Sequence, residues 1–172
     1  SNDSNARLLR KKIEGEFINH MELLKNGDHL ITGKDGLYIL SAKTYHLNEL
    51  QIREKNANCI FSYQDSKARI WIGTRYHLHC YDSSYHFLFT APDIGDGWAR
   101  CIWENNDHQF YVGSNGLFSI DINSKPFIVK KVNPYFDHSM INFLFKDKRN
   151  RVWIGSDNGL FLYDMNENKI RS

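Results

Sequence analysis

The sequence predicts an all-β protein made of four antiparallel sheets in series, and three observations support this class. First, the 172-residue chain is 41% hydrophobic and 14% aromatic, which is typical of a folded core rather than of disorder. Second, four similar segments recur, anchored on glycines that are 40, 40 and 42 residues apart: Gly33, Gly73, Gly113 and Gly155. Third, apolar and polar residues alternate within each segment, which is the period of a half-buried strand.

The first strand of each repeat is expected upstream of the anchoring glycine. Residues 14, 12 and 10 positions before that glycine are mostly apolar in every copy, so this face is expected to meet a core. These residues are Asn19, Met21 and Leu23; Cys59, Phe61 and Tyr63; Ala99, Cys101 and Trp103; and Ile141, Phe143 and Phe145. Polar turns follow, which separates this strand from the next one.

A hairpin follows in each repeat. Its two strands are expected at residues 30–33 and 37–40, 71–74 and 78–82, 111–114 and 117–121, and 153–156 and 160–164. Three connecting turns carry Asp35-Gly36, Asn115-Gly116 or Asn158-Gly159, pairs that supply the positive φ angles of tight hairpins. Trp71, Tyr111 and Trp153 recur in phase two residues before the glycine, which indicates packing between blades rather than a binding site.

An outer strand is expected in three repeats, at residues 45–52, 85–90 and 126–132, whereas the fourth repeat is expected to have only three complete strands. Four antiparallel strands per roughly 40 residues form the unit of a β-propeller blade. We therefore expect a partial propeller of about four four-stranded antiparallel blades, at about residues 15–54, 55–94, 95–134 and 135–172.

Residues 1–14 are predicted to hold a tag remnant, which starts Ser1-Asn2-Asp3-Ser4, and a stray outer strand at residues 6–12. Exposed strand edges invite pairing, so we expect this strand to complete the fourth blade of its own chain or of a second copy. The expected assembly is a homodimer, or self-association through blade edges.

The fourth repeat carries the most specific pattern. Residues 152–164 read Val-Trp-Ile-Gly-Ser-Asp-Asn-Gly-Leu-Phe-Leu-Tyr-Asp, after the acidic turn residue Asp147. This resembles the two-component regulator propeller repeat, and the resemblance extends over residues 15–172. It is weaker in the third repeat, where Tyr111 stands for the tryptophan, and weakest in the first, where Ile31 does.

The resemblance implies the periplasmic sensor region of a Bacteroides-type hybrid two-component protein, and such sensors often respond to glycan fragments. We therefore expect an extracytoplasmic ligand-sensing segment that binds a carbohydrate. The alternative is a protein-interaction or assembly scaffold without a small ligand. A propeller enzyme such as a polysaccharide lyase is the third possibility, because one fold hosts many functions.

Other functions find no support in the composition. The 22 basic and 20 acidic residues nearly balance, which argues against a nucleic-acid or anionic-membrane partner. No nucleophile elbow, phosphate-binding loop or His-Glu-x-x-His helix is present, so we expect no enzyme and no cofactor. Cys59, Cys80 and Cys101 form no Cys-x-x-Cys pair and are expected in the core. His77 and His79 share a strand face, but no third ligand is placed, so no metal site is expected.

The candidate binding site follows from where the repeat departs from its pattern. In a blade, the turn between the second and third strands opens on the same face as the link to the next blade. In the second repeat this turn lacks glycine, and the links are expected at residues 53–58, 92–98 and 133–138. Aromatic rings and charged groups there suit a sugar. The candidate ligand-binding residues are Arg75, Tyr76, His77, Asp93, Asp96, Trp98, Tyr135 and His138.

Overall fold

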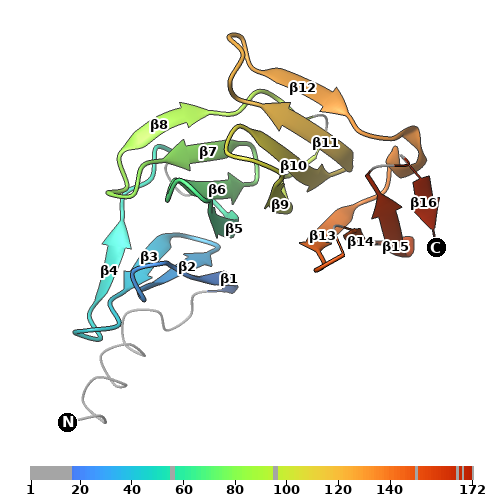
Figure 1. Cartoon of the computed structure of the whole chain (residues 1–172). Helices are drawn as coiled ribbons and strands as arrows, with labels where there is room; N and C mark the ends of the chain where they lie inside the picture. Colours follow the sequence, from blue (N-terminus) through green and yellow to red (C-terminus); the bar gives the residue numbers. More distant parts are fainter. Residues whose placement is uncertain are drawn as a thin grey trace. The chain divides into compact units, whose positions relative to one another are not determined.

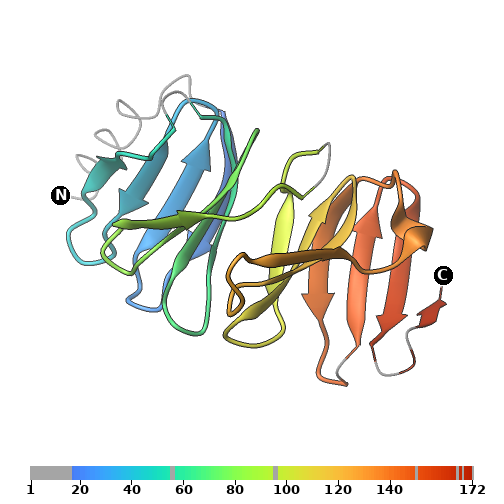
Figure 2. The same cartoon turned by 90° about the horizontal axis from the view of Figure 1, so that it is seen from above.

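A computed structural model of the chain describes residues 17–54, 57–94, 97–149, 151–165, 167 and 169–171. Its strands form four four-stranded sheets, and neighbours in the sequence are neighbours in each sheet (Figures 1 and 2). This confirms the predicted all-β class with antiparallel blades. Among the described residues the one helical element is the short 3-10 helix η1, Pro134–Phe136. None of these residues belongs to a helix that has both the length and the apolarity to cross a bilayer.

The sheets are numbered 1 to 4 in chain order. Sheet 1 contains β1 (Ile18–Leu23), β2 (His29–Gly33), β3 (Leu37–Leu40) and β4 (Leu47–Leu50). Sheet 2 contains β5 (Cys59–Gln64), β6 (Ile70–Thr74), β7 (Leu78–Tyr81) and β8 (Phe87–Thr90). Sheet 3 contains β9 (Cys101–Glu104), β10 (Gln109–Ser114), β11 (Gly116–Asp121) and β12 (Ile128–Lys131). Sheet 4 contains β13 (Ile141–Lys146), β14 (Val152–Ser156), β15 (Gly159–Asp164) and β16 (Lys169–Arg171).

The chain divides into two compact units, the first with sheets 1 and 2 and the second with sheets 3 and 4. The division falls within sheet 2, because the tip of the β6–β7 hairpin, Tyr76–Leu78, and the chain from Thr90 onward group with the second unit. Each unit has its own apolar core. The first is built around Leu30, Leu37, Cys59, Ile70 and Ile72, and the second around Leu117, Phe136, Ile141, Ile154 and Phe161.

The anchoring glycines have a steric role. In sheet 2, Phe61 pairs with Gly73, and a Cβ on Gly73 would collide with the Phe61 ring. Cys101 pairs with Gly113 in the same way, and the Cys101 sulfur lies 2.5 Å from where a Cβ would be. The repeated glycine therefore leaves room for the side chain that the first strand places opposite it.

The first repeat does not follow this pattern at its glycine. Thr32, not Gly33, pairs with both His20 on β1 and Leu37 on β3. In sheet 4 the same central place, between β13 and β15, belongs to Gly155. The structural anchor of the first repeat is therefore Thr32, one residue before the predicted anchor Gly33.

This one-residue shift corrects the predicted core face of the first strand. Asn19, Met21 and Leu23 were expected to face a core, but Met21 is 55% exposed and Leu23 is 64% exposed. Because side chains alternate along a strand, a shift of one residue exchanges the two faces. His20 and Leu24 face sheet 2 instead: His20 lies 3.4 Å from Ser62, and Leu24 belongs to the first core.

Two further expectations need correction. Sheet 4 has its own outer strand, because β16 pairs with β15, so the expectation of only three strands there is wrong. The predicted outer strand at residues 6–12 lies outside the described residues. Of the three Gly turns, Gly116 and Gly159 have φ angles of 128° and 125° as predicted, whereas Gly36 is not left-handed.

Candidate functional site

Two pockets are built by the same pair of elements, in successive repeats. One, the sheet 1 pocket, lies between the β2–β3 turn and the link that follows β4, and it has about 600 Å³ of empty space counted to its open mouth. The other, the sheet 2 pocket, lies between the β6–β7 turn and the link that follows β8, with about 270 Å³. The prediction that turn and link open on one face therefore holds for both.

The sheet 2 pocket contains three of the predicted site residues. Tyr76 and His77 come from the β6–β7 turn and Asp93 from the link, and all three are exposed. The Ala91 amide donates to the Leu78 carbonyl oxygen at 2.8 Å, which ties the link to the turn. Backbone pairing thus fixes the spacing of the pocket walls, while the side chains remain open to solvent.

Two other predicted residues flank this pocket without lining it. Trp98 lies between the lining residues Gly97 and Ala99, is 37% exposed, and has the Arg100 guanidinium 5.4 Å from its ring centre. Arg75 is exposed as the first residue of the β6–β7 turn, and its amide donates to the Asn58 carbonyl oxygen. Asp96 lies outside the described residues.

The corresponding space in the third repeat is filled. The link there forms η1, whose Phe136 is fully buried in the second core, to which Leu117 of β11 also belongs. Tyr135 packs edge-on against Phe161 with 5.4 Å between ring centres, although 57% of it stays exposed. His138 is exposed and has a left-handed backbone with a φ of 67°. Tyr135 and His138 therefore lie beside a packed aromatic cluster rather than in the sheet 2 pocket.

Sequence reasoning missed the sheet 1 pocket. Its lining carries three carboxylates, Asp35, Glu49 and Glu54, together with Gln51. The link at residues 53–58 was recognised, and the β2–β3 turn was too. Asp35-Gly36 fits the repeat pattern, whereas the predicted site rests on departures from that pattern. The sequence does contain a signal for this pocket, because the β2–β3 turn and the link after β4 both carry acidic residues.

The most strongly organised carboxylates lie elsewhere, in the turns between first and second strands. Asp65 is buried and accepts from Arg69 Nε at 2.6 Å and from Trp71 Nε1 at 2.9 Å. Asp147 repeats this arrangement with Arg151 Nε at 2.7 Å and Trp153 Nε1 at 3.2 Å. The hydrogen bonds from Arg151 hold the pKa of the Asp147 carboxyl well below its usual range. These groups stabilise turns and are not placed to act on a ligand.

The cysteines are also structural. All three thiols are free, and burial raises the pKa of Cys80 and of Cys101 to about 12. A thiol with such a pKa holds almost no thiolate at neutral pH, so neither is a nucleophile.

The four four-stranded antiparallel sheets, three of them with a turn and a link on one face, are blades of the β-propeller class. The chain is similar to the extracellular domain of a putative hybrid two-component system from Bacteroides thetaiotaomicron, with a TM-score of 0.74 at 18% identity over 90% of this chain and 22% of that chain. A second such domain from that organism matches with a TM-score of 0.75 at 20% identity, over 90% of this chain and 23% of that chain.

A propeller of another kind is also similar. Virginiamycin B lyase from Staphylococcus aureus matches with a TM-score of 0.70 at 13% identity, over 90% of this chain and 54% of that chain. No protein-family model and no curated protein matches the sequence. At these identities the likeness shows the fold, and the chain spans less than a quarter of the two extracellular domains.

Proposed function

We propose that this chain is a ligand-sensing propeller segment from the periplasmic part of a two-component signalling sensor, and that it is not an enzyme. The observation that carries the proposal is the likeness to two extracellular domains of putative hybrid two-component systems. The repeat pattern supports the same class independently, through the in-phase residues around Gly73, Gly113 and Gly155.

The ligand in this proposal is a carbohydrate bound at the sheet 2 pocket. Tyr76, 66% exposed, offers a ring against which the apolar face of a sugar can stack. His77 and Asp93, on the two walls of the pocket, offer hydrogen-bonding groups for hydroxyls. The enclosed part of the pocket is only about 20 Å³, far below the volume of small-molecule sites, so in this proposal the sugar lies across the mouth of the pocket, against the exposed Tyr76 ring, and does not enter it.

Calorimetric titration of the whole chain against a panel of oligosaccharides tests this proposal. We expect saturable binding by at least one glycan, weakened about tenfold or more in Tyr76→Ala, because a tenfold change is about 1.4 kcal/mol and a ring contact contributes on that order. Tyr45→Ala is the matched control, since Tyr45 is 58% exposed in a different turn. If Tyr76→Ala binds with unchanged affinity, the proposed location of the site is contradicted. If no glycan in the panel binds, the proposal of a carbohydrate ligand is contradicted.

A second observation favours self-association. In the second unit, Cys101, Trp103 and Tyr111 of sheet 3 pack against sheet 4. The equivalent face of sheet 4 holds Phe143 and Phe145, which are 55% and 52% exposed. We propose that a second copy of the chain covers this face, because the equivalent face of sheet 3 is covered by sheet 4.

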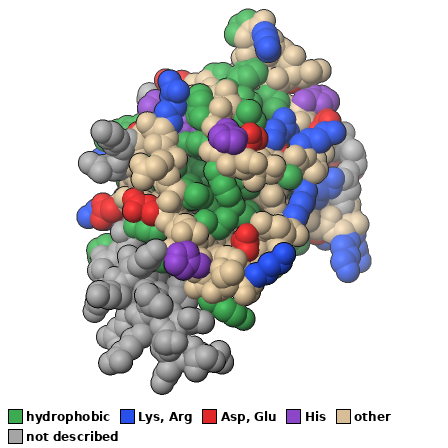
Figure 3. Space-filling model, turned by 90° about the vertical axis from the view of Figure 1, so that its left-hand side faces the viewer, with side chains coloured by type: hydrophobic (Ala, Val, Ile, Leu, Met, Phe, Trp, Pro, Cys, Tyr) green, Lys and Arg blue, Asp and Glu red, His purple; other side chains and the backbone are tan. Residues whose placement is uncertain are grey.

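Sheet 1 has exposed apolar side chains of its own. Met21 and Leu23 are exposed on β1. Figure 3 shows one face of the molecule, on which hydrophobic side chains gather among charged ones. The proposed association therefore has apolar surface available in each unit. The oligomeric state of the chain in solution tests it, with the variants described in the Discussion.

A further inference from the structure

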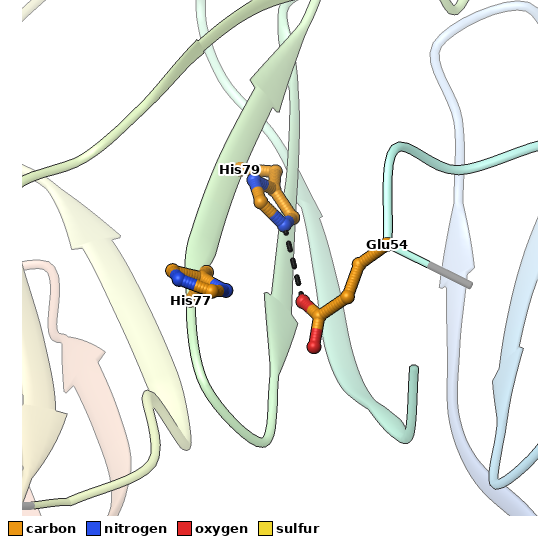
Figure 4. Close-up of side chains that lie close together, drawn as sticks. All are labelled: Glu54, His77 and His79. Carbon is orange, nitrogen blue, oxygen red and sulfur yellow. Dashed lines mark hydrogen bonds and ion pairs between the residues drawn. The ribbon is translucent and has the colours of Figure 1, made fainter. Parts of the chain in front are cut away.

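A carboxylate and two imidazoles meet beside the β6–β7 hairpin. Glu54 lies in the link after sheet 1, His79 lies on β7, and His77 lies one residue before that strand (Figure 4). Glu54 Oε2 is 3.3 Å from His79 Nε2, and the ligand atoms of all three residues lie within 4.8 Å of one another. His77 and His79 are separated by one residue of the same chain segment, so the local backbone sets the distance between them.

Two of these three side chains are held in place by buried neighbours. Thr74, which is fully buried, donates its hydroxyl to Glu54 Oε2 at 3.0 Å. The His79 ring is 3% exposed and packs against Tyr81 and Phe87, with 6.4 and 6.0 Å between ring centres. A partner that orients a ligating carboxylate is what metal sites use to fix their ligands. Glu54 and His79 are therefore preorganised, whereas His77 is exposed to solvent.

The distances suit a small divalent cation. When each ligand lies about 2.0–2.1 Å from a tetrahedral Zn²⁺, ligand atoms are about 3.3–3.4 Å apart. The Glu54–His79 separation of 3.3 Å already has this value, and rotation of His77 would bring the third atom closer. Two imidazole nitrogens and one carboxylate oxygen are a donor set that favours Zn²⁺ over Mg²⁺ or Ca²⁺.

The surroundings favour a cation as well. Glu54 also lines the sheet 1 pocket, together with Asp35 and Glu49. Carboxylates that line one concave surface raise the local concentration of cations. The pocket is open to solvent, so it provides an access route to the Glu54 carboxylate.

We propose that Glu54, His77 and His79 form a binding site for a Zn²⁺-like divalent cation. The bound ion would join the link after sheet 1 to the third strand of sheet 2, two segments that are 23 residues apart at Glu54 and His77. This revises the expectation of no metal site, which rested on the lack of a third ligand: Glu54 is that ligand. The cation site does not depend on the proposed sugar-binding function, although His77 belongs to both sites.

Zn²⁺ binding by the whole chain, freed of metal with a chelator and dialysed at neutral pH, tests the proposal. We expect one tightly bound Zn²⁺ per chain and a rise in Tm with Zn²⁺ concentration, because an ion that binds only the folded state stabilises it. In His77→Ala and Glu54→Gln we expect affinity to fall roughly tenfold or more. His77 is exposed, and Gln at position 54 keeps an oxygen for Thr74, so both variants are expected to fold.

His46→Ala is the control, because His46 is exposed in the β3–β4 turn, away from the three ligands. It is expected to bind Zn²⁺ like the wild-type chain. The proposal is overturned if the wild-type chain takes up no stoichiometric Zn²⁺, or if His77→Ala and Glu54→Gln bind it with unchanged affinity. Since sugar binding is measured separately, failure of the metal site leaves the proposed function to its own test.

Discussion

The two tryptophans at one repeat position do not have the same surroundings. Trp71 is fully buried and meets Phe89 edge-on, with 5.6 Å between ring centres. Trp153 makes the equivalent hydrogen bond to Asp147 but is only partly buried, and Arg151 lies over its ring at 5.7 Å. Tryptophans at equivalent repeat positions are therefore expected to contribute differently to the free energy of unfolding, according to how far neighbouring side chains bury them.

Trp71→Ala is expected to lower the free energy of unfolding by about 3–5 kcal/mol, as other large core truncations do. Trp153→Ala is expected to cost less, because part of that ring is already in water. Lys148→Ala, in an exposed turn, should change stability by under about 0.5 kcal/mol. Chemical denaturation measures all three, and a larger loss at Trp153 than at Trp71 would contradict the assignment of burial.

Asp147 makes the stability of its turn depend on pH. Its pKa is depressed in the folded chain by Arg151 and by backbone amides, so the ionised form is the one that the fold stabilises. That stabilisation is complete above the ordinary carboxyl pKa of about 4 and is lost as the pH falls below it toward the depressed value. The Tm difference between the wild-type chain and Asp147→Asn should therefore shrink between about pH 6 and pH 3. A difference that stays constant over this range would contradict the depressed pKa.

At the scale of one sheet, the paired glycine controls how closely the first two strands pack. A methyl group at Gly73 would meet the ring of Phe61, which is 5% exposed and has little room to move. Gly155 is different: a Cβ there would lie 3.3 Å from the Phe143 Cβ, and Phe143 is largely exposed.

Gly73→Ala should therefore destabilise the chain by about 1–3 kcal/mol or more, as overpacking of a core does. Gly155→Ala should cost less than about 1 kcal/mol, since a Cβ 3.3 Å from the Phe143 Cβ needs only a small backbone shift and displaces no buried ring. The midpoints of urea unfolding, at constant slope, give the comparison. Equal shifts in the two variants would show that the glycine is needed for some reason other than the residue opposite it.

Strand order and hairpins were predictable because they depend on local signals: alternation, a glycine and a turn pair. The register of sheet 1 was not, because Thr32 can take the glycine's place where His20 lies opposite it, and no glycine marks that position. The strand β16 was missed since its three residues carry no apolar run. Part of the site was predictable from the glycine-free turn at Tyr76, but Glu54 was not. Its meeting with His79 depends on how the link folds back, which periodicity does not encode.

At the scale of the whole molecule, light scattering over a range of concentrations tests the proposed association. We expect the wild-type chain to show a dimer mass at high concentration. Phe145→Lys should shift it toward the monomer, because a charge in an apolar interface is costly to bury. Leu88→Lys is the control, as Leu88 is 46% exposed on β8, outside the face proposed to associate. A monomeric wild-type chain, or equal effects of the two substitutions, would contradict a second copy on sheet 4.

The repeated pairing of a turn with a link separates the lining of each space from the sheet that supports it. In sheets 1, 2 and 3 the same space is acidic and open, small and aromatic-rimmed, or occupied by Phe136. The strands beneath it keep the same order in every copy. Substitutions in a link should therefore change the lining of its space while the strand order of the sheet beneath stays the same. One scaffold therefore presents three different surfaces, and a substitution in one link alters one of them without altering the other two.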